Sequence, residues 1–265
     1  MIILLMVCFM YKISRSRGMR ELAIEEVERH AAASWPSVQS ESLGDWKLRA
    51  TYGVTKRANS VLTIGEPSPG WIETTEHFYQ KLGLSAIFMI SASSPSGIDE
   101  ELERNGYEKI DECYTMVKEA GILSPPDLHE GDILLIDEAD DAWLHSFLSL
   151  EGFPNERASA YQAIFSRING KKAFAVYREA GLTLAVGTAV CEGDLCCISN
   201  IVVGEKSRGK GIAKKLVSSL LEWGRALGAG YSYLQVVKSN APAIGLYEKL
   251  GFTPLSSHHY RIKSE

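Results

Sequence analysis

Residues 198–217 read ISNIVVGEKSRGKGIAKKLV, and this stretch gives the clearest indication of the fold. An apolar strand, a loop rich in glycine and cations, and a helix follow one another in it. The start of a helix carries unpaired backbone N–H groups and the positive end of the helix dipole, so it attracts phosphate. Gly209 and Gly211 allow a closer backbone approach than a Cβ would permit, and Arg208 and Lys210 add positive charge. The stretch therefore predicts a phosphate-binding loop.

Three known phosphate-binding patterns can be compared with this loop. The segment GEKSRGKG follows G-x-x-x-x-G-K, but Gly211 stands where a hydroxyl residue would hold Mg²⁺. The dinucleotide pattern G-x-G-x-x-G fails because Lys214 replaces its third glycine, and no ribose-binding acid follows at the expected distance. The third pattern, R-G-x-G-x-A, is matched in full by residues 208–213. An ordinary solvated loop is the remaining interpretation, and the motif that follows downstream disfavours it.

A second motif, VVKSNAPAIGLYEKLGF, lies at residues 236–252, one helix and one strand beyond the loop. With the loop, it resembles the GNAT superfamily of N-acetyltransferases, and the resemblance covers residues 132–263. The resemblance implies an α/β (α+β) fold, the GNAT acyl-CoA N-acyltransferase fold, with a mixed central sheet flanked by helices. It further implies acetyl-CoA as co-substrate, no metal ion, and direct attack of an amine on the thioester in a ternary complex.

The resemblance also gives individual residues a role. The backbone N–H groups of residues 208–213 would bind the pyrophosphate of coenzyme A, and the strand at 201–203 would pair with the pantetheine arm and polarise the thioester carbonyl. Tyr247 corresponds to the general acid that protonates the leaving thiolate, and a tyrosine that fills the core is the alternative. Asn240 corresponds to the asparagine that orients the cofactor. The expected cofactor-binding residues are Ile201, Val202, Val203, Arg208, Gly209, Lys210, Gly211, Ile212, Ala213, Asn240 and Tyr247, and Tyr247 is also the expected catalytic residue.

The sequence leaves the general base and the acceptor open. Glu192, Asp194 and Glu205 lie near the strand and loop, but such carboxylates are usually only solvated, and ordered water is the alternative base. The acceptor is expected to be a small-molecule amine or a peptide. By analogy with the fold, the helices between residues 141 and 168 are expected to cover its site. A non-catalytic acyl-CoA-binding sensor or interaction module on the same fold is the rival function.

The chain is expected to contain two related halves. The turn-rich stretch at 121–131 predicts a linker between residues 19–120 and a catalytic domain at 132–265. The segment ERNGYEKIDECYTMVK at 103–118 repeats the pattern of EKLGFTPLSSHHYRIK at 248–263, in which a helix ends at glycine and an aromatic residue leads into a strand. A shorter repeat, FYQKLGL against LYEKLGF, matches more closely in letters. A closing pair of strands is expected at the end of the chain.

The first half resembles a degenerate GNAT domain, as in tandem acetyltransferases. It has no R-G-x-G-x-A loop, and Leu102 stands at the position of Tyr247 when the final helices are aligned, so this half should not catalyse. Arg49, Arg57 or Asn59 could contact an acceptor from a polar hairpin. A solvated hairpin that packs on the catalytic sheet is the alternative.

Composition limits the class of protein. The 265 residues carry a formal net charge of −5, so the chain lacks the excess of basic residues that is typical of nucleic-acid-binding proteins. An apolar run at residues 2–10 is too short to span a bilayer, and no signal-peptide pattern surrounds it. We therefore expect residues 1–18 to be an extension upstream of Met19 and no stable membrane insertion, with a short membrane anchor as the alternative. The sequence does not indicate the oligomeric state.

The five cysteines indicate a reducing environment. Their odd number, with Cys196 and Cys197 adjacent, does not fit a disulfide framework, so a cytoplasmic protein is expected. Cys191 joins this pair without C-x-x-C spacing or a nearby histidine, which argues against a metal site. We expect buried thiols on strands instead.

Overall fold

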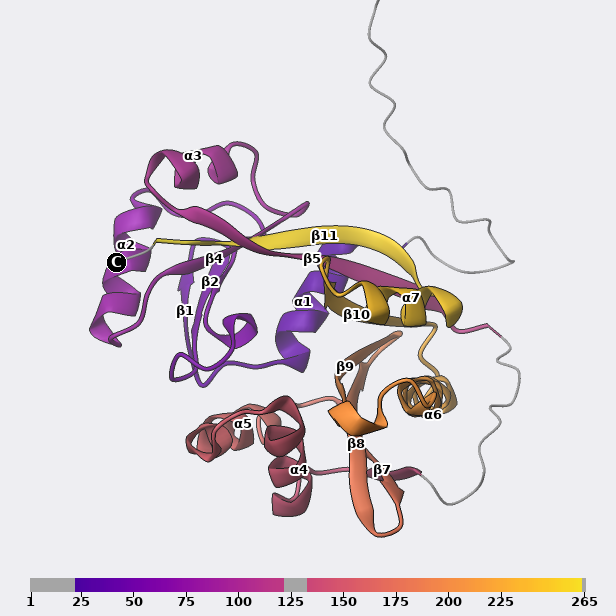
Figure 1. The fold of residues 1–265 in the computed structure, drawn as a ribbon. Helices are drawn as coiled ribbons and strands as arrows, with labels where there is room; N and C mark the ends of the chain where they lie inside the picture. Colours follow the sequence, from indigo (N-terminus) through magenta and orange to yellow (C-terminus); the bar gives the residue numbers. More distant parts are fainter. Residues whose placement is uncertain (1–21, 122–132, 264–265) are drawn as a thin grey trace, which may run out of the picture.

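The computed structural model describes residues 22–121 and 133–263. Figure 1 shows their arrangement. The first half contains α1 (Ile24–Ser34), β1 (Gln39–Leu43), β2 (Trp46–Ala50), the 3-10 turn η1 (Lys56–Ala58), β3 (Val61–Leu62), α2 (Trp71–Lys81), β4 (Ile87–Ser91), α3 (Ile98–Arg104) and β5 (Glu108–Glu119). The second half contains β6 (Ile133–Ile136), α4 (Asp141–Glu151), η2 (Asn155–Arg157), α5 (Ala158–Phe165), β7 (Lys171–Glu179), β8 (Leu182–Glu192), β9 (Leu195–Val203), η3 (Glu205–Ser207), α6 (Ile212–Ala226), β10 (Tyr231–Val237), α7 (Ala241–Lys249) and β11 (Thr253–Ile262).

The strands of the described residues form a single sheet that runs through both halves. Its order is β1-β2-β3-β4-β11-β5-β10-β9-β8-β7-β6. The last strands of the two halves are therefore interleaved: β11 lies between β4 and β5, and β5 lies between β11 and β10. Figure 1 shows these two long strands crossing the middle of the molecule. Each half thus completes the sheet of the other.

The order of elements repeats between the halves. Only β3–β4 and β9–β10 pair in parallel, and each pair is joined by one helix, α2 or α6. A helix and a long strand follow in both cases, α3 with β5 and α7 with β11. Tyr107 N donates to Leu102 O at 3.0 Å, and Phe252 N donates to Tyr247 O at the same distance. The longer of the two sequence repeats therefore matches the order of elements, and Leu102 occupies the position of Tyr247.

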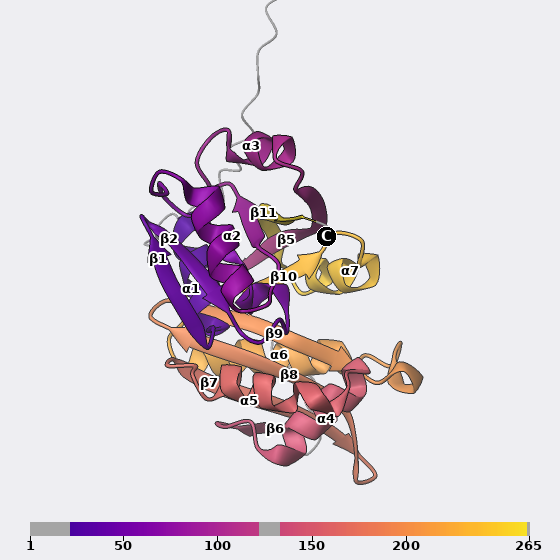
Figure 2. The ribbon, with the colours of Figure 1, turned by 90° about the vertical axis from the view of Figure 1, so that its left-hand side faces the viewer.

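Helices cover both faces of the sheet in the second half (Figure 2). The alternation of β7 makes this possible, because Ala173, Ala175 and Tyr177 pack in the cluster that contains α6 and α7. Phe174 and Val176 pack on the opposite face against α4 and α5. Helix α1 comes from the first half, but its Val27 packs with β5, β9 and β10. The interior is therefore shared between the two halves.

The structure corrects the expectation of a closing strand pair. Residues 253–262 form one strand, β11, in place of the expected pair. Irregularities in the pairing with β5, at Pro254/Ser256 and His258/Tyr260, absorb this polar sequence without a reversal. Strand β1 was not predicted, because QSESL is a polar edge strand without the apolar alternation that marks a buried one.

Some expectations fall outside the described residues. These are the extension at residues 1–18 and nearly all of the linker at 121–131. The domain boundaries at 19–120 and 132–265 stay a prediction. Within 22–121 and 133–263, no helix is long and apolar enough to cross a membrane.

We expect the chain to unfold in one cooperative transition. Each half would lose the pairing of its long last strand if the other half unfolded, so partial unfolding should be unfavourable. Urea unfolding followed by tryptophan fluorescence and by far-UV circular dichroism should give coincident curves. Two separated transitions would contradict this expectation and indicate halves that fold independently.

Candidate active site

Strands β9 and β10 separate after a short parallel pairing, and a cavity lies between them. They pair only at Tyr231↔Leu195, Ser232↔Cys196 and Tyr233↔Cys197. Beyond these positions, residues 198–201 of β9 and 234–237 of β10 line a cavity of about 460 Å³. One edge of β9 pairs with β8, so the N–H and C=O groups of its other edge are left without a strand partner along this opening.

A bulge in β9 lies where the strands diverge. The register passes from Thr188↔Ser199 to Val186↔Val202, so Asn200 and Ile201 oppose a single residue of β8. Asn200 has φ of 54°, which is uncommon for a residue other than glycine. Its Nδ2 donates to Thr188 Oγ1 at 2.9 Å, which holds the unusual backbone in place. As a result of the bulge, Asn200 and Ile201 both line the cavity.

The glycine-rich loop connects β9 to α6. Gly209 and Gly211 have φ of 77° and 78°, a region that glycine occupies without a steric cost, and Gly211 is the residue that caps α6. A Cβ built at either glycine would meet no atom within 4 Å, so the space above both is open. Arg208 Nε donates to Val203 O at 3.2 Å, which fixes the loop to the end of the strand. The first N–H groups of α6 therefore face an open surface.

Helix α7 places two of the predicted residues on the cavity wall. Asn240 caps this helix, and its side chain accepts a hydrogen bond from Ala243 N at 3.2 Å. Tyr247 is 9% exposed and packs edge-on against Phe252, with ring centroids 5.9 Å apart. Burial raises the pKa of Tyr247 to about 12. The phenol therefore keeps its proton at physiological pH and can act as a proton donor.

Nine of the eleven predicted cofactor residues fall into two groups in the structure, and Val202 and Val203 belong to neither. Ile201, Asn240 and Tyr247 line the cavity. The loop residues 208–213 lie outside it at the start of α6, where Ile212 is buried as an anchor in the core. Val202 points to the opposite face, into the cluster with α4 and α5, so only its backbone could contact a cofactor.

The first half supplies part of the opposite wall. Its contribution includes Lys56 and Arg57 from η1, with Asp111 and Cys113 from β5. Lys56 Nζ lies 2.7 Å from Asp111 Oδ2, so these two charges form an ion pair. The Arg57 guanidinium lies 4.0 Å from the centroid of the Trp35 ring and donates to Asn200 Oδ1 at 3.1 Å. Arg57 therefore connects the first half to the bulge of β9.

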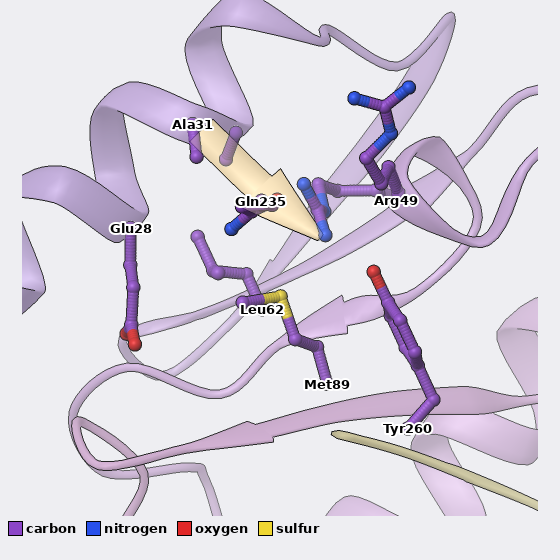
Figure 3. Close-up of a pocket in the computed structure, with 9 residues that line it drawn as sticks. Glu28, Ala31, Arg49, Leu62, Met89, Gln235 and Tyr260 are labelled. Carbon is purple, nitrogen blue, oxygen red and sulfur yellow. The ribbon is translucent and has the colours of Figure 1, made fainter. Parts of the chain in front are cut away.

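Arg49 and Asn59, the other two candidates for acceptor contact, do not line this cavity. Asn59 accepts hydrogen bonds from Thr51 N and Gly53 N and donates to three carbonyl oxygens of the same turn, so it stabilises the loop before η1. Arg49 is 6% exposed and donates to Ser60 O and Ser60 Oγ at 3.0 Å. It lines a small neighbouring cavity of about 10 Å³, which shares Arg57, Gln235 and Tyr260 with this one. Figure 3 shows Leu62 and Met89 between Glu28 and Tyr260 in the small cavity.

The helical segment at 141–168 forms another part of the wall, and its expected role over an acceptor site stays a prediction. Phe147, Glu151, Phe153, Arg157 and Tyr161 line the cavity from this segment. Much of the Glu151 side chain reaches solvent, but burial of its carboxyl group raises the pKa. The positive charges of Arg57 and Arg208 oppose that rise.

The three carboxylates suggested as bases do not line the cavity. Asp194 Oδ1 accepts a hydrogen bond from Gly230 N at 2.7 Å, while Glu192 and Glu205 are exposed outside it. The cavity instead contains Glu151 and His258, which sequence reasoning missed. No local motif surrounds either residue, and only the folded sheet brings them together. The bulge at Asn200 was missed for the same reason.

The cysteines of the described residues behave as expected. Cys113, Cys191, Cys196 and Cys197 are buried free thiols, and the last three lie on β8 and β9. Burial raises the pKa of Cys197, as it does for Cys113. Across the two described ranges, no group of three or more His, Cys, Asp or Glu side chains could hold a metal ion.

We expect His258 to make stability depend on pH. Burial lowers its pKa from 6.5 to about 4, and the side chain is 4% exposed. Between these values the unfolded chain binds a proton that the folded chain does not, so stability is fully present above pH 6.5 and falls as the pH drops toward 4. The loss should reach about 3 kcal/mol.

Chemical unfolding of wild type and His258→Gln at several pH values between 4 and 7 measures this contribution. The variant should show a shallower dependence of the free energy of unfolding on pH. His145→Gln, at an exposed position of α4, is the matched control and should keep the wild-type slope. Equal slopes in wild type and His258→Gln would exclude His258 as the source.

Comparisons with known proteins agree with this geometry. A family model described as "Probable histone acetyltransferase Rv0428c C-terminal" matches residues 22–263. The uncharacterized N-acetyltransferase YobR of Bacillus subtilis (strain 168) is 43% identical over 244 residues, which make up 91% of this chain and 98% of YobR.

Solved structures show the fold. A GCN5-related N-acetyltransferase from Kribbella flavida has a TM-score of 0.66 at 15% identity and covers 90% of this chain and 95% of its own. A tandem GNAT protein from the clavulanic acid biosynthesis pathway has a TM-score of 0.60 at 15% identity, with coverage of 89% and 86%. The expected GNAT fold, a mixed sheet flanked by helices, is confirmed. Within that fold class, the chain belongs to the acetyltransferase family whose model is described from the C-terminal part of Rv0428c.

Proposed function

We propose that the protein is an N-acetyltransferase that moves an acetyl group from acetyl-CoA to an amine. The observation that carries this proposal is the opening between β9 and β10, which has a glycine-capped helix start at β9's end and Asn240 and Tyr247 on its wall. A small amine or a peptide amine could reach the opposite wall. The buried free thiols fit a reducing compartment, so we place the protein in the cytoplasm.

The chain has a suitable surface for three parts of acetyl-CoA: the pyrophosphate, the pantetheine arm and the acyl group. The open space above Gly209 and Gly211 and the free helix start suit the pyrophosphate. The unpaired edge of β9 suits the amide groups of the pantetheine arm, because extended ligands add to strand edges through backbone hydrogen bonds. The cavity beyond the bulge is large enough for an acyl group and an acceptor.

Each chemical role can be assigned to a group of the chain. Acetyl-CoA, when bound, supplies an activated acyl thioester. A backbone N–H on the open edge of β9 can donate to the acyl oxygen, and the Tyr247 hydroxyl can donate its proton to the leaving sulfur. Glu151, which is in no ion pair within the described residues, can accept the proton of the acceptor ammonium, and burial raises its pKa toward the range that suits this task.

The first half completes the site in this proposal. We regard it as a degenerate GNAT-like domain without its own catalytic residue, since Leu102 replaces the tyrosine and Gly70, not an R-G-x-G-x-A loop, precedes α2. Its role would be to contribute η1 and β5 to the wall on the acceptor side.

Release of free thiol from acetyl-CoA in the presence of an amine panel tests the proposal. Amine-dependent release with formation of the acetylated amine supports the enzyme. Binding of acetyl-CoA without release for any amine would contradict it and favour a non-catalytic acyl-CoA sensor. Wild-type protein without added amine gives the background rate.

A further inference from the structure

We propose that the acceptor amine carries an anionic group, most simply a carboxylate, and that Arg57 and Arg157 bind this group. The inference rests on the proposed acetyl transfer and names the acceptor class for the same site. It starts from the wall that faces α7 across the cavity, which is built from η1 and the segment between α4 and α5.

The ionic groups of the cavity leave an excess of positive charge. Its cations are Lys56, Arg57 and Arg157, and its carboxylates are Asp111 and Glu151. Lys56 and Asp111 form an ion pair at 2.7 Å. Among the ion pairs of the described residues, none within 4.0 Å involves either arginine. Two arginines without an ion-pair partner among the described residues therefore face the single carboxylate of Glu151.

Arg57 is held in a fixed position that still leaves donors to spare. One face of its guanidinium stacks on Trp35, whose ring is fixed by edge contacts with Tyr161 and Phe165. One of its N–H groups donates to Asn200. A guanidinium has five N–H donors in a planar fork, and such a fork matches the two oxygens of a carboxylate. Because the side chain is ordered in advance, little entropy is lost on binding.

Arg157 has a similar arrangement on the neighbouring wall. Its guanidinium carbon lies 4.9 Å from the centroid of the Phe153 ring. Both arginines lie near Tyr161, because the positive charge of each opposes the rise in the pKa of Tyr161 that burial causes. The two cations therefore flank one aromatic wall of the cavity.

This charge distribution discriminates between acceptor classes. A lysine-rich peptide or a polyamine would bring further positive charge toward two unpaired arginines, which is unfavourable in a partly buried site. An amino acid or another amine with a nearby carboxylate would place its anion on the arginines and its ammonium toward Glu151. The description of the matching family model refers to a histone acetyltransferase, but the cavity of this chain suits an anionic acceptor better.

A comparison of matched acceptors on the wild-type protein tests this inference. Free L-amino acids and their α-carboxamides are assayed by thiol release, with amine concentrations corrected for ionisation, beside spermidine and a lysine-rich peptide. The free acid of the best pair should have a kcat/KM at least about tenfold above its amide, as expected for the loss of one charged hydrogen-bonded pair. Succinate, which has no amine, should inhibit competitively against the acceptor and not against acetyl-CoA.

Variants locate the effect. Arg57→Gln should remove most of the preference for the acid through KM and leave the KM for acetyl-CoA unchanged, while Arg57→Lys should keep part of it. Arg29→Gln, an exposed arginine on α1 outside the cavity, is the control with the same charge change. Equal or better activity with amides, spermidine or the peptide would overturn the inference and leave the proposed acetyl transfer intact. Absence of acetyl-CoA binding would contradict both the proposed acetyl transfer and this inference about its acceptor.

Discussion

Tyr247→Phe is expected to lower kcat by roughly 100-fold or more, which is the usual contribution of a positioned proton donor. The change removes only the hydroxyl, and the ring keeps its contact with Phe252. Affinity for acetyl-CoA should therefore stay nearly the same. Steady-state kinetics with the best acceptor, together with calorimetric titration of the variant, separate the two effects.

Tyr52→Phe is the matched control for this prediction. Tyr52 is 64% exposed, so the same chemical change there should leave turnover unaffected. With a pKa of about 12, Tyr247 should also stay protonated throughout the usual assay range, so no loss of activity between pH 8 and 10 should depend on it. Unchanged turnover in Tyr247→Phe would show that this tyrosine only fills the core.

Gly211→Glu is expected to remove acetyl-CoA binding. The new side chain would extend into the open space above the helix start and place a negative charge where the pyrophosphate would bind. Loss of charged hydrogen bonds of about 1.5–3 kcal/mol each implies a drop in affinity of roughly 100-fold or more. Thermal stabilisation by acetyl-CoA, which follows affinity, should therefore disappear.

The first half offers a close control for this variant. Gly70 caps α2 with φ of 72°, as Gly211 caps α6 with φ of 78°, and a Cβ at Gly70 also meets no atom within 4 Å. Gly70→Glu should therefore carry a similar backbone cost of about 1–2 kcal/mol and still be stabilised by acetyl-CoA. If Gly211→Glu kept the wild-type stabilisation, the loop would not be the cofactor site.

The loop and α7 could be singled out from the sequence because they consist of two short contiguous motifs, while their role in cofactor binding stays a prediction. The loop glycines require positive φ, and the structure gives Gly209 and Gly211 that conformation. Asn240 and Tyr247 lie seven positions apart on one helix, and both line the cavity. Local spacing is sufficient to predict such a group.

The acceptor side could not be predicted in this way. Arg57, Glu151, Arg157 and His258 come from four separate elements, and only the folded sheet brings them together. The pairing of β5 with β10 and of β11 with β4 could not be predicted either, because the sequence of each strand is that of an ordinary last strand in its own half. Which neighbour a strand pairs with depends on tertiary packing, not on local propensity.

Under the proposed function, the first half contributes to the site although Leu102 stands where the second half has Tyr247. It completes the sheet through β5, covers β9 and β10 with α1, and places Arg57 beside the bulge at Asn200. Loss of the pairing with β5 or of the packing of α1 would change the shape of the opening between β9 and β10.

Calorimetric titration of the wild-type protein with acetyl-CoA tests the central claim most directly. We predict saturable binding to one site per chain, because the chain has one glycine-capped loop of the R-G-x-G-x-A type. Absence of saturable binding would contradict the acetyltransferase proposal and leave a GNAT fold that serves another ligand.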